Sequence, residues 1–467
     1  MKRYEGILFV IYGKGNEIEF YRNIGKYLLQ NNIKYKLVVI DLFDKKNEND
    51  CEVFFDKFES ISGELFDRDF QKEFYYFYQD RFINELSYLT CYGQYNATYK
   101  KIVKAFVKMS NFIYYILNKY PNYLIYSGAP DNYFANTFIA VANFLDRKYF
   151  WLEKSYWCNG YTFFSDKEYT NDVFKGEIEI KNTLELNQLK EIFSKTAIES
   201  NKQLFQYQNI LEKLKSNFEF LKNYKKYHSY KEKIIYIPWI NYPLIDDFKN
   251  KFCRNIKRFI NNKIYAYNSL SIKDIVKLSE KYKILFFPLH YQPEAATLTM
   301  QPFFNNQYFL IKLISDILPP NWILLVKEHP IQDYGLRKLN FYKDISSSKN
   351  TFLVDNNLTI DELSSCIDKI ITIGGTFGFE SILKGKDVAV CSNIYYSNYD
   401  KIYKMFFDIY NFDKTKELFN NFLNLSINSD NYLELEIFLN RYYNSILQLD
   451  LKNSIKYIFK NIERFWK

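Results

Sequence analysis

Two of the three histidines in this chain directly follow stretches that resemble buried strands. His290 comes after the apolar run at 286–289, and His329 comes after the run at 323–326 and two charged residues. Enzymes with parallel sheets place reactive groups where the strands end. His290 is therefore a candidate catalytic residue. The alternative for either histidine is a structural role, with the ring hydrogen-bonded to the backbone.

Of the two histidine segments, Lys327-Glu328-His329-Pro330 gives the more specific signal. Lys327 and His329 have the alternating spacing of a strand end, which places both on one side. Pro330 ends the strand and fixes the turn. A cation and an imidazole donor at this position suit a phosphate or pyrophosphate group. The alternative is a solvated strand end that carries charges of both signs.

A second candidate is the segment 372–380, which follows a strand and opens a helix. Gly374 and Gly375 let the backbone approach a ligand closely. The Thr376 hydroxyl and the N–H groups at the helix start can bind phosphate. Glu380 lies one helical turn later on the same face, where a carboxylate can accept hydrogen bonds from ribose hydroxyls. The alternative is a plain glycine-rich turn.

The first half of the chain offers weaker signals. Gly13 and Gly15 follow the first strand, but the third glycine of a dinucleotide fingerprint is replaced by Ile18, so a tight turn lining a cleft is expected. Glu153 ends a strand and Asp131 lies in a turn. Either carboxylate could serve as the base of a transferase, although a helix cap is the alternative for Asp131.

Composition excludes several classes of protein. The chain has 467 residues, 48% of them hydrophobic and 20% aromatic, with only 14 glycines and 10 prolines. These values exclude a disordered, collagen-like or low-complexity chain. The six cysteines form no C-x-x-C pair, which argues against a zinc ribbon or a disulfide framework. A net charge of +9 permits contact with an anionic ligand or membrane without showing one.

Strands and helices alternate along most of the chain, which predicts an α/β protein. We expect one set of strands at 7–12, 35–41, 123–126 and 148–152, and another at 234–238, 284–288, 322–327, 351–354, 369–373 and 387–391. Two Rossmann-like parallel-sheet domains, at 1–228 and 229–400, should face one another across a cleft that holds the site. Helices at 401–467 should pack across both domains.

No stretch of the sequence is long and apolar enough to span a bilayer, and the apolar run at 7–12 is too short for a secretory signal. We therefore expect a cytoplasmic protein. The stretch 452–467 alternates basic with apolar residues at helical spacing. We expect an amphipathic helix packed on its own protein, with peripheral contact with the cytoplasmic membrane face as the alternative.

In their order and spacing, these motifs resemble the capsule polysaccharide biosynthesis family, which includes the group-2 capsule Kdo transferases. The resemblance rests on FPLHYQPEAAT at 287–297, VKEHP at 326–330, and Gly374-Gly375-Thr376 with Glu380. More loosely, YFWLE at 149–153, the pair Asn159-Gly160 and the pair Ser165-Asp166 resemble the family's strand-Glu-loop-Asp region. The chain departs from the family at 156–158, where Tyr-Trp-Cys replaces the usual Gly and Pro.

The resemblance implies a GT-B fold, with the donor nucleotide bound mainly by the C-terminal domain. It implies that His329 contacts the donor phosphate, with Thr376 beside it, and that Glu380 holds the ribose. Lys327, Pro330, Gly374 and Gly375 belong to the same donor site. Two further residues, together with His290, would line the cleft near the donor: Gln292 and Glu294. Proteins of this type generally need no bound metal, so no cofactor is expected.

The function expected from these features is a glycosyltransferase of bacterial surface polysaccharide synthesis. A sugar would pass from a nucleotide-activated donor, of the CMP-Kdo or CMP-sialic-acid type, to a glycan or lipid-linked acceptor. One alternative is a CDP-polyol phosphotransferase of the teichoic-acid type. Another is a non-catalytic binding protein of capsule assembly. Nucleic acid is not expected as a partner, because basic and acidic residues are interspersed.

Overall fold

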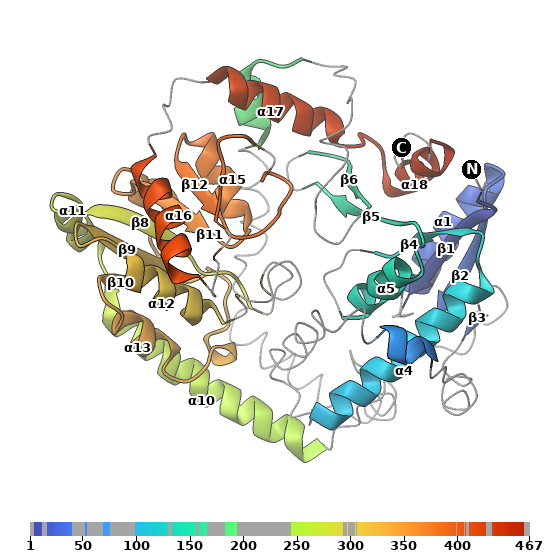
Figure 1. Ribbon diagram of the computed structural model, residues 1–467, viewed down its shortest axis with the longest axis horizontal. Helices are drawn as coiled ribbons and strands as arrows, with labels where there is room; N and C mark the ends of the chain where they lie inside the picture. The colour runs from blue at the N-terminus through green and yellow to red at the C-terminus, as the bar shows by residue number, and fades with distance from the viewer. Residues whose placement is uncertain are drawn as a thin grey trace, which may run out of the picture.

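The computed structural model describes residues 4–11, 16–39, 52–53, 69–74, 99–128, 133–155, 158–165, 183–193, 244–292, 297, 304, 306–397, 399–405, 407, 411–425 and 432–461. Two separate sheets, each with helices on both faces, make up the fold (Figure 1). The predicted α/β architecture with two Rossmann-like sheets is confirmed. The predicted boundary at residue 228 and the predicted strand at 234–238 lie outside the described residues.

The first sheet has the strand order β3-β2-β1-β4-β5-β6. All neighbours are parallel except β5 and β6, which are antiparallel. This is the strand order of a Rossmann fold. The strands are β1 (Gly6–Ile11), β2 (Lys34–Val39), β3 (Glu52–Val53), β4 (Tyr123–Tyr126), β5 (Tyr149–Lys154) and β6 (Tyr161–Phe164).

The second sheet is entirely parallel, with the order β13-β12-β11-β8-β9-β10-β7. Apart from the edge strand β7, it repeats the Rossmann order of the first sheet. The strands are β7 (Ser269–Leu270), β8 (Lys283–Pro288), β9 (Trp322–Lys327), β10 (Thr351–Val354), β11 (Lys369–Thr372), β12 (Asp387–Val390) and β13 (Tyr403–Lys404).

Side chains that alternate along each strand enter different cores, because successive residues of a strand point to opposite faces. On β9, Leu324 and Val326 pack into one core, and Ile323 and Leu325 pack into the other. Both faces are therefore buried, which explains the nearly continuous apolar strand sequences.

The helices are likewise divided between the two sheets. Those around the second sheet are α10 (Leu244–Asn268), α11 (Ile272–Ser279), α12 (Gln307–Ile317), α13 (Phe341–Ser346), α14 (Ile360–Ser364), α15 (Thr376–Leu383) and α16 (Phe412–Asn424), with a short 3-10 turn at Tyr334–Leu336. Those around the first sheet are α1 (Asn16–Gln30), α4 (Tyr99–Lys119) and α5 (Tyr133–Phe144), and the C-terminal part of the chain forms α17 (Tyr432–Ser445) and α18 (Leu451–Lys460). None of the described helices has both the length and the apolar composition that a membrane span requires.

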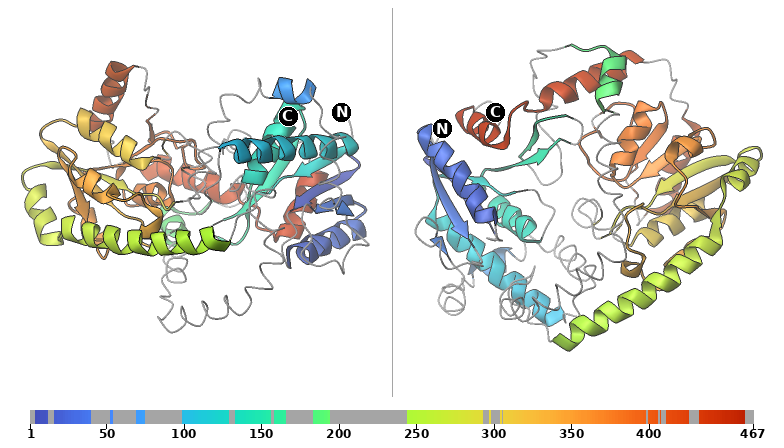
Figure 2. Two further views of the ribbon diagram at one scale, coloured as in Figure 1. Left: turned by 90° about the horizontal axis from the view of Figure 1, so that it is seen from below. Right: turned by 180° about the vertical axis from the view of Figure 1, so that it is seen from behind.

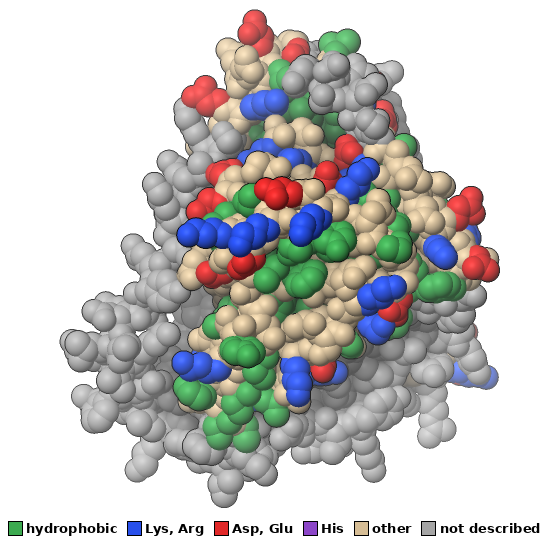
Figure 3. Space-filling view, turned by 90° about the vertical axis from the view of Figure 1, so that its left-hand side faces the viewer, with side chains coloured by type: hydrophobic (Ala, Val, Ile, Leu, Met, Phe, Trp, Pro, Cys, Tyr) green, Lys and Arg blue, Asp and Glu red, His purple; other side chains and the backbone are tan. Residues whose placement is uncertain are grey.

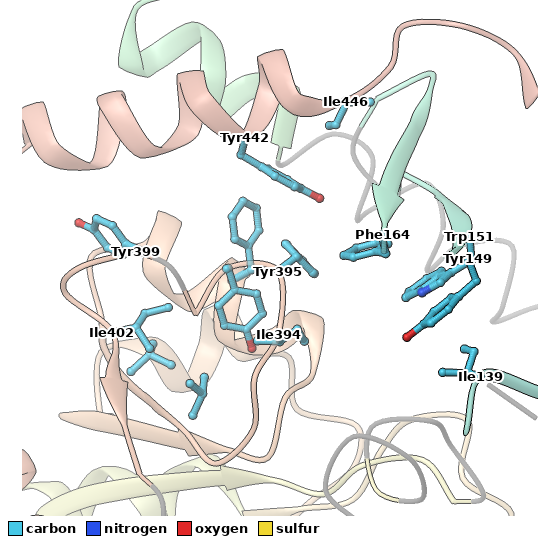
Figure 4. Close-up of a cluster of buried hydrophobic side chains, with 14 of the residues drawn as sticks. Ile139, Tyr149, Trp151, Phe164, Ile394, Tyr395, Tyr399, Ile402, Tyr442 and Ile446 are labelled. Atoms are coloured by element: carbon cyan, nitrogen blue, oxygen red, sulfur yellow. The ribbon is translucent and has the colours of Figure 1, made fainter. Parts of the chain in front are cut away.

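The two halves meet at Tyr442 of α17. Its ring lies 5.1 Å from that of Tyr395 and 5.8 Å from that of Phe379, on the side of the second sheet. Its hydroxyl is hydrogen-bonded to Ser155 and Thr162, on the side of the first sheet. Figure 4 shows Tyr442 above Tyr395, with its hydroxyl directed toward Phe164. One tyrosine thus joins the cores of both halves.

The last described helix, α18, packs on the half of the molecule that contains β1. Ile455 and Ile458 of α18 are fully buried in a core that also contains residues of β1 and α1. Figure 2 shows α18 beside the N-terminal elements. As far as Lys460, the helix therefore packs on its own protein, as expected, and its apolar face is not available to a membrane.

We expect Ile458→Ala to lower the free energy of unfolding by about 2–5 kcal/mol, because it leaves a cavity in the core shared by α18 and β1. Urea unfolding followed by circular dichroism would measure the change. The control is Leu449→Ala, since Leu449 precedes the same helix but is exposed; it should change stability by less than about 0.5 kcal/mol. Equal effects of the two variants would contradict this packing.

Candidate functional site

The second sheet contains a topological switch point between β8 and β11. From β8 the chain proceeds to β9 on one side, and it later returns to β11 on the other side. Parallel α/β sheets bind their ligands outside the carboxyl ends of the strands at such a point. His290 follows β8 and the Gly374-Gly375 turn follows β11, so the topology brings two of the predicted segments to one edge.

The two segments are in direct contact. The buried His290 ring places Nε2 3.1 Å from the hydroxyl oxygen of Thr372. The Gly374 N–H donates to the same nitrogen at 3.4 Å. Because Nε2 accepts this hydrogen bond, the neutral ring carries its proton on Nδ1.

The backbone of His290 is held as firmly as its ring. The Gln307 side-chain oxygen accepts from the His290 N–H at 2.8 Å, and the Gln307 amide donates to the His290 carbonyl at 3.1 Å. Gln307 is the first residue of α12 and is buried. This double contact fixes the loop after β8 to the start of a helix.

Both glycines of the turn are required by their neighbours. A Cβ at Gly374 would lie 2.2 Å from the Ser392 hydroxyl oxygen, and one at Gly375 would lie 3.0 Å from the His290 ring. No larger residue could keep this close approach without displacing its neighbours. Glycine at these positions lets the imidazole lie against the backbone just before α15.

The N-terminus of α15 is not capped by a side chain. Gly375 occupies the cap position, and Thr376, the first helical residue, is exposed. The N–H groups of a first helical turn have no acceptor within the helix, and the helix dipole makes this end electropositive. The arrangement can therefore bind an anionic group such as a phosphate.

Glu380 lies one turn further along α15, half-buried, and forms no hydrogen bond with the part of the chain that the structure describes. Burial raises its pKa to about 7, with Lys384 acting to lower it and Asp361 to raise it further. Its protonation therefore changes near neutral pH. A ligand that donates hydrogen bonds to the carboxylate would favour the ionised form.

The loop after β9 lies next to the loop after β8, because the two strands are neighbours. The Gln332 side chain accepts from the Gln292 N–H at 2.7 Å and donates to the Gln292 carbonyl at 3.2 Å. The rings of Tyr291 and His329 are 5.9 Å apart. His329 is half-buried, and its Nδ1 accepts from the Ile331 N–H at 3.4 Å.

Arg337 and Glu328 form a buried ion pair beneath these loops. The Arg337 guanidinium donates to the Glu328 carboxylate at 2.7 and 2.8 Å, and both side chains are almost fully inaccessible. Although burial acts to lower the pKa of Arg337, the Glu328 carboxylate outweighs it and raises that pKa. Tyr342 donates a further hydrogen bond to Glu328 at 2.5 Å.

The same guanidinium reaches the loop after β8. It donates to the His290 carbonyl at 2.8 Å and to the Gln292 side-chain oxygen at 2.7 Å. Glu328, in turn, accepts from the His329 N–H at 2.7 Å. Arg337 therefore connects the loop that carries His290 with the loop that carries His329. Sequence analysis missed this residue, and the solvated strand end considered for the KEHP segment is wrong for Glu328, which is buried.

The remaining predicted residues lie apart from this cluster or outside the described residues. Lys327 donates to the backbone and side-chain oxygens of Asn356 at 3.1 and 3.0 Å, and burial lowers its pKa. Pro330 is exposed. Glu153 belongs to the first sheet, where it is half-buried opposite Thr162, and its charge contributes to raising the pKa of Tyr442. The residues outside the described part are Gly13, Gly15, Asp131, Asp166 and Glu294.

We expect Arg337→Met to lower the free energy of unfolding by about 3–5 kcal/mol, because it leaves the Glu328 carboxylate buried without its partner. The double variant Arg337→Met, Glu328→Leu should lose less than the sum of the two single variants. Urea unfolding would measure all three.

The control is Lys312→Met, which breaks an exposed ion pair with Asp316 on α12. It should cost less than about 0.5 kcal/mol. Strict additivity of the Arg337 and Glu328 substitutions would contradict a coupled buried pair.

Comparison with known proteins gave no match to a protein-family model and none to a curated protein. Among solved structures, a beta Kdo 2,7 transferase, Thermosulfurimonas dismutans KpsC, is 16% identical over 40% of this chain and 57% of that chain, with a TM-score of 0.24. The S. aureus MnaA–UDP co-structure is 11% identical over 99% and 98%, with a TM-score of 0.28. The UDP-GlcNAc 2-epimerase of Methanocaldococcus jannaschii is 12% identical over 94% and 98%, with a TM-score of 0.26.

The family that the sequence resembles is thus represented among the matching structures. The chain spans little more than half of the length of that Kdo transferase.

Proposed function

We propose that the protein is a cytoplasmic glycosyltransferase of bacterial surface polysaccharide synthesis that uses a nucleotide-activated sugar. One observation carries the proposal: His290 and the glycine turn before α15 meet at the switch point of the second sheet, beside an uncapped helix N-terminus. A donor of the CMP-Kdo or CMP-sialic-acid type is favoured by the resemblance of the motifs to capsule transferases.

In the proposed mechanism, the second sheet binds the donor and the first sheet binds a glycan or lipid-linked acceptor. The N–H groups at the start of α15 and the Thr376 hydroxyl hold the donor phosphate, where negative charge builds up as the sugar leaves. The loop carrying His329 closes over the same phosphate, and Glu380 accepts hydrogen bonds from the ribose. These groups lower the energy of the departing nucleotide without a metal ion.

The acceptor hydroxyl attacks the anomeric carbon of the sugar, and a carboxylate takes its proton. Glu153 is the first candidate for this base, since it ends a strand of the first sheet and is half-buried. Asp131 is the second candidate. His290 is buried and hydrogen-bonded to Thr372 and Gly374 just before α15, so we assign it to the phosphate end of the donor.

A thermal-shift screen with CMP, CDP, UDP and GDP tests the proposal. A nucleotide present at ten to a hundred times its dissociation constant stabilises the protein by about 1.4–2.7 kcal/mol. We expect CMP to raise the melting temperature and Gly375→Val to abolish the shift, because the new side chain enters the space beside His290. Val276→Ala, an exposed change on α11, is the control.

Other outcomes of the screen point elsewhere. A shift with UDP alone would contradict the CMP donor while leaving a transferase in place. A response to CDP alone would favour polyol-phosphate transfer. If no nucleotide changes the melting temperature, the donor site itself is refuted and a binding protein becomes the better account.

The pKa of Glu380 adds a pH dependence. Because the ionised carboxylate is the better acceptor for ribose hydroxyls, the affinity for the nucleotide should increase as pH rises through about 7. Calorimetric titrations across this range would measure it. In Glu380→Gln the increase in affinity near pH 7 should be lost, which leaves only the change near pH ~6 from the second ionisation of the nucleotide phosphate. Asp316→Asn, an exposed change on α12, should keep both. An identical pH profile in wild type and Glu380→Gln would exclude contact with the ribose.

A further inference from the structure

One face of α10 is hydrogen-bonded to the part of the chain around the second sheet. These bonds set the rotation of the helix about its own axis. The buried Asn261 amide donates to the Tyr334 carbonyl at 2.9 Å, and the Tyr265 hydroxyl donates to the Val354 carbonyl at 2.5 Å. The remaining face of this 25-residue helix therefore points away from the sheet.

That outward face carries large apolar side chains. Ile256 is 43% exposed, Phe259 is 66% exposed and Tyr267 is 89% exposed. Together with Lys263 they recur at intervals of three, four and four residues, which places them on one side of a helix. We call these four residues the α10 face. Water-exposed side chains of this size at regular helical spacing indicate a surface that contacts a partner.

The C-terminal part of α10 carries an excess of positive charge. From 253 to 268 the helix carries Arg254, Lys257, Arg258 and Lys263 and no acidic residue. Asp333 binds both arginines at 2.6 Å and offsets one positive charge. Figure 3 shows the side of the molecule where the C-terminal part of α10 is found, on which basic, apolar and acidic side chains are interspersed. A partner for this surface must therefore offer both negative charge and an apolar interior.

We propose that the α10 face docks the protein on an anionic phospholipid surface. Basic side chains are attracted to acidic headgroups, and aromatic and aliphatic side chains enter the boundary between headgroups and acyl chains. This assignment goes beyond the proposed transferase activity. It also differs from the site that the sequence suggested, since the apolar face of α18 is buried against the first sheet.

A second copy of this chain fits the α10 face less well. Symmetric docking would place one set of basic residues against an identical set, and like charges across an interface are repelled. Double-stranded nucleic acid supplies negative charge, but its base faces are stacked inside the duplex and offer no apolar region for Ile256 and Phe259. A lipid surface satisfies both requirements.

Vesicle co-sedimentation with the full chain tests the proposal. We expect binding to vesicles of equal parts phosphatidylglycerol and phosphatidylcholine, weakening as salt increases, and none to phosphatidylcholine alone. Phe259→Ser with Tyr267→Ser should reduce the apparent affinity by about tenfold or more. The control, Phe412→Ser with Leu433→Ser, removes comparably exposed side chains elsewhere and should bind as the wild type does.

A second variant keeps the test independent of stability. In Phe259→Trp, the tryptophan emission should shift to shorter wavelength when anionic vesicles are added, because the ring leaves water. Absence of vesicle binding, equal losses in both double variants, or an unshifted emission would overturn the proposal. A dimer that Phe259→Ser dissociates, or RNA binding lost in the same variant, would replace the lipid with that partner. Nucleotide binding should be unchanged in every variant, so failure here is separate from failure of the donor site.

Discussion

The second half of the molecule depends on keeping one arginine buried. A guanidinium without partners in the protein interior is too costly to persist, so Arg337 requires the Glu328 carboxylate and a full set of acceptors. Those acceptors are the His290 carbonyl and the Gln292 side chain on one loop, and the glutamate on the next. Satisfying the charge therefore sets the conformation of the two loops at the carboxyl edge of the sheet.

The strand order explains why these loops matter. Both sheets follow the same Rossmann order, and in the second sheet the reversal falls between β8 and β11. His290 bridges this point by contacting Thr372 and Gly374, so the switch point is closed by an imidazole rather than by packed aliphatic side chains. A polar, rigid edge next to an electropositive helix end is suited to recognising a phosphate group. Tyr442 links this half to the strand that carries Glu153.

Much of this architecture could be predicted from the sequence. The strands at 123–126, 322–327 and 351–354 were predicted to the residue, because uninterrupted apolar runs between turn residues leave little choice. The short strands β3, β7 and β13 were not, since two residues carry no periodic signal. Helix α12 begins at Gln307, and the side chain of this residue holds the backbone of His290. Arg337 could not be identified, because its partners are fixed only when the loops after β8 and β9 come together. The sequence signal for this ion pair was Glu328, which lies between a strand and His329. Its burial could not be judged from neighbouring residues alone.

The central claim is that a nucleotide phosphate binds beside His290 and the turn that opens α15. Selective ¹⁵N labelling of histidine tests it most directly, because the chain has only three histidines. In the free protein, the account predicts an imidazole protonated at Nδ1 that disappears in His290→Gln. Adding CMP should shift the resonances of His290 and His329. Resonances of both residues that stay unchanged at saturating CMP, or a His290 ring protonated at Nε2 alone, would contradict the account.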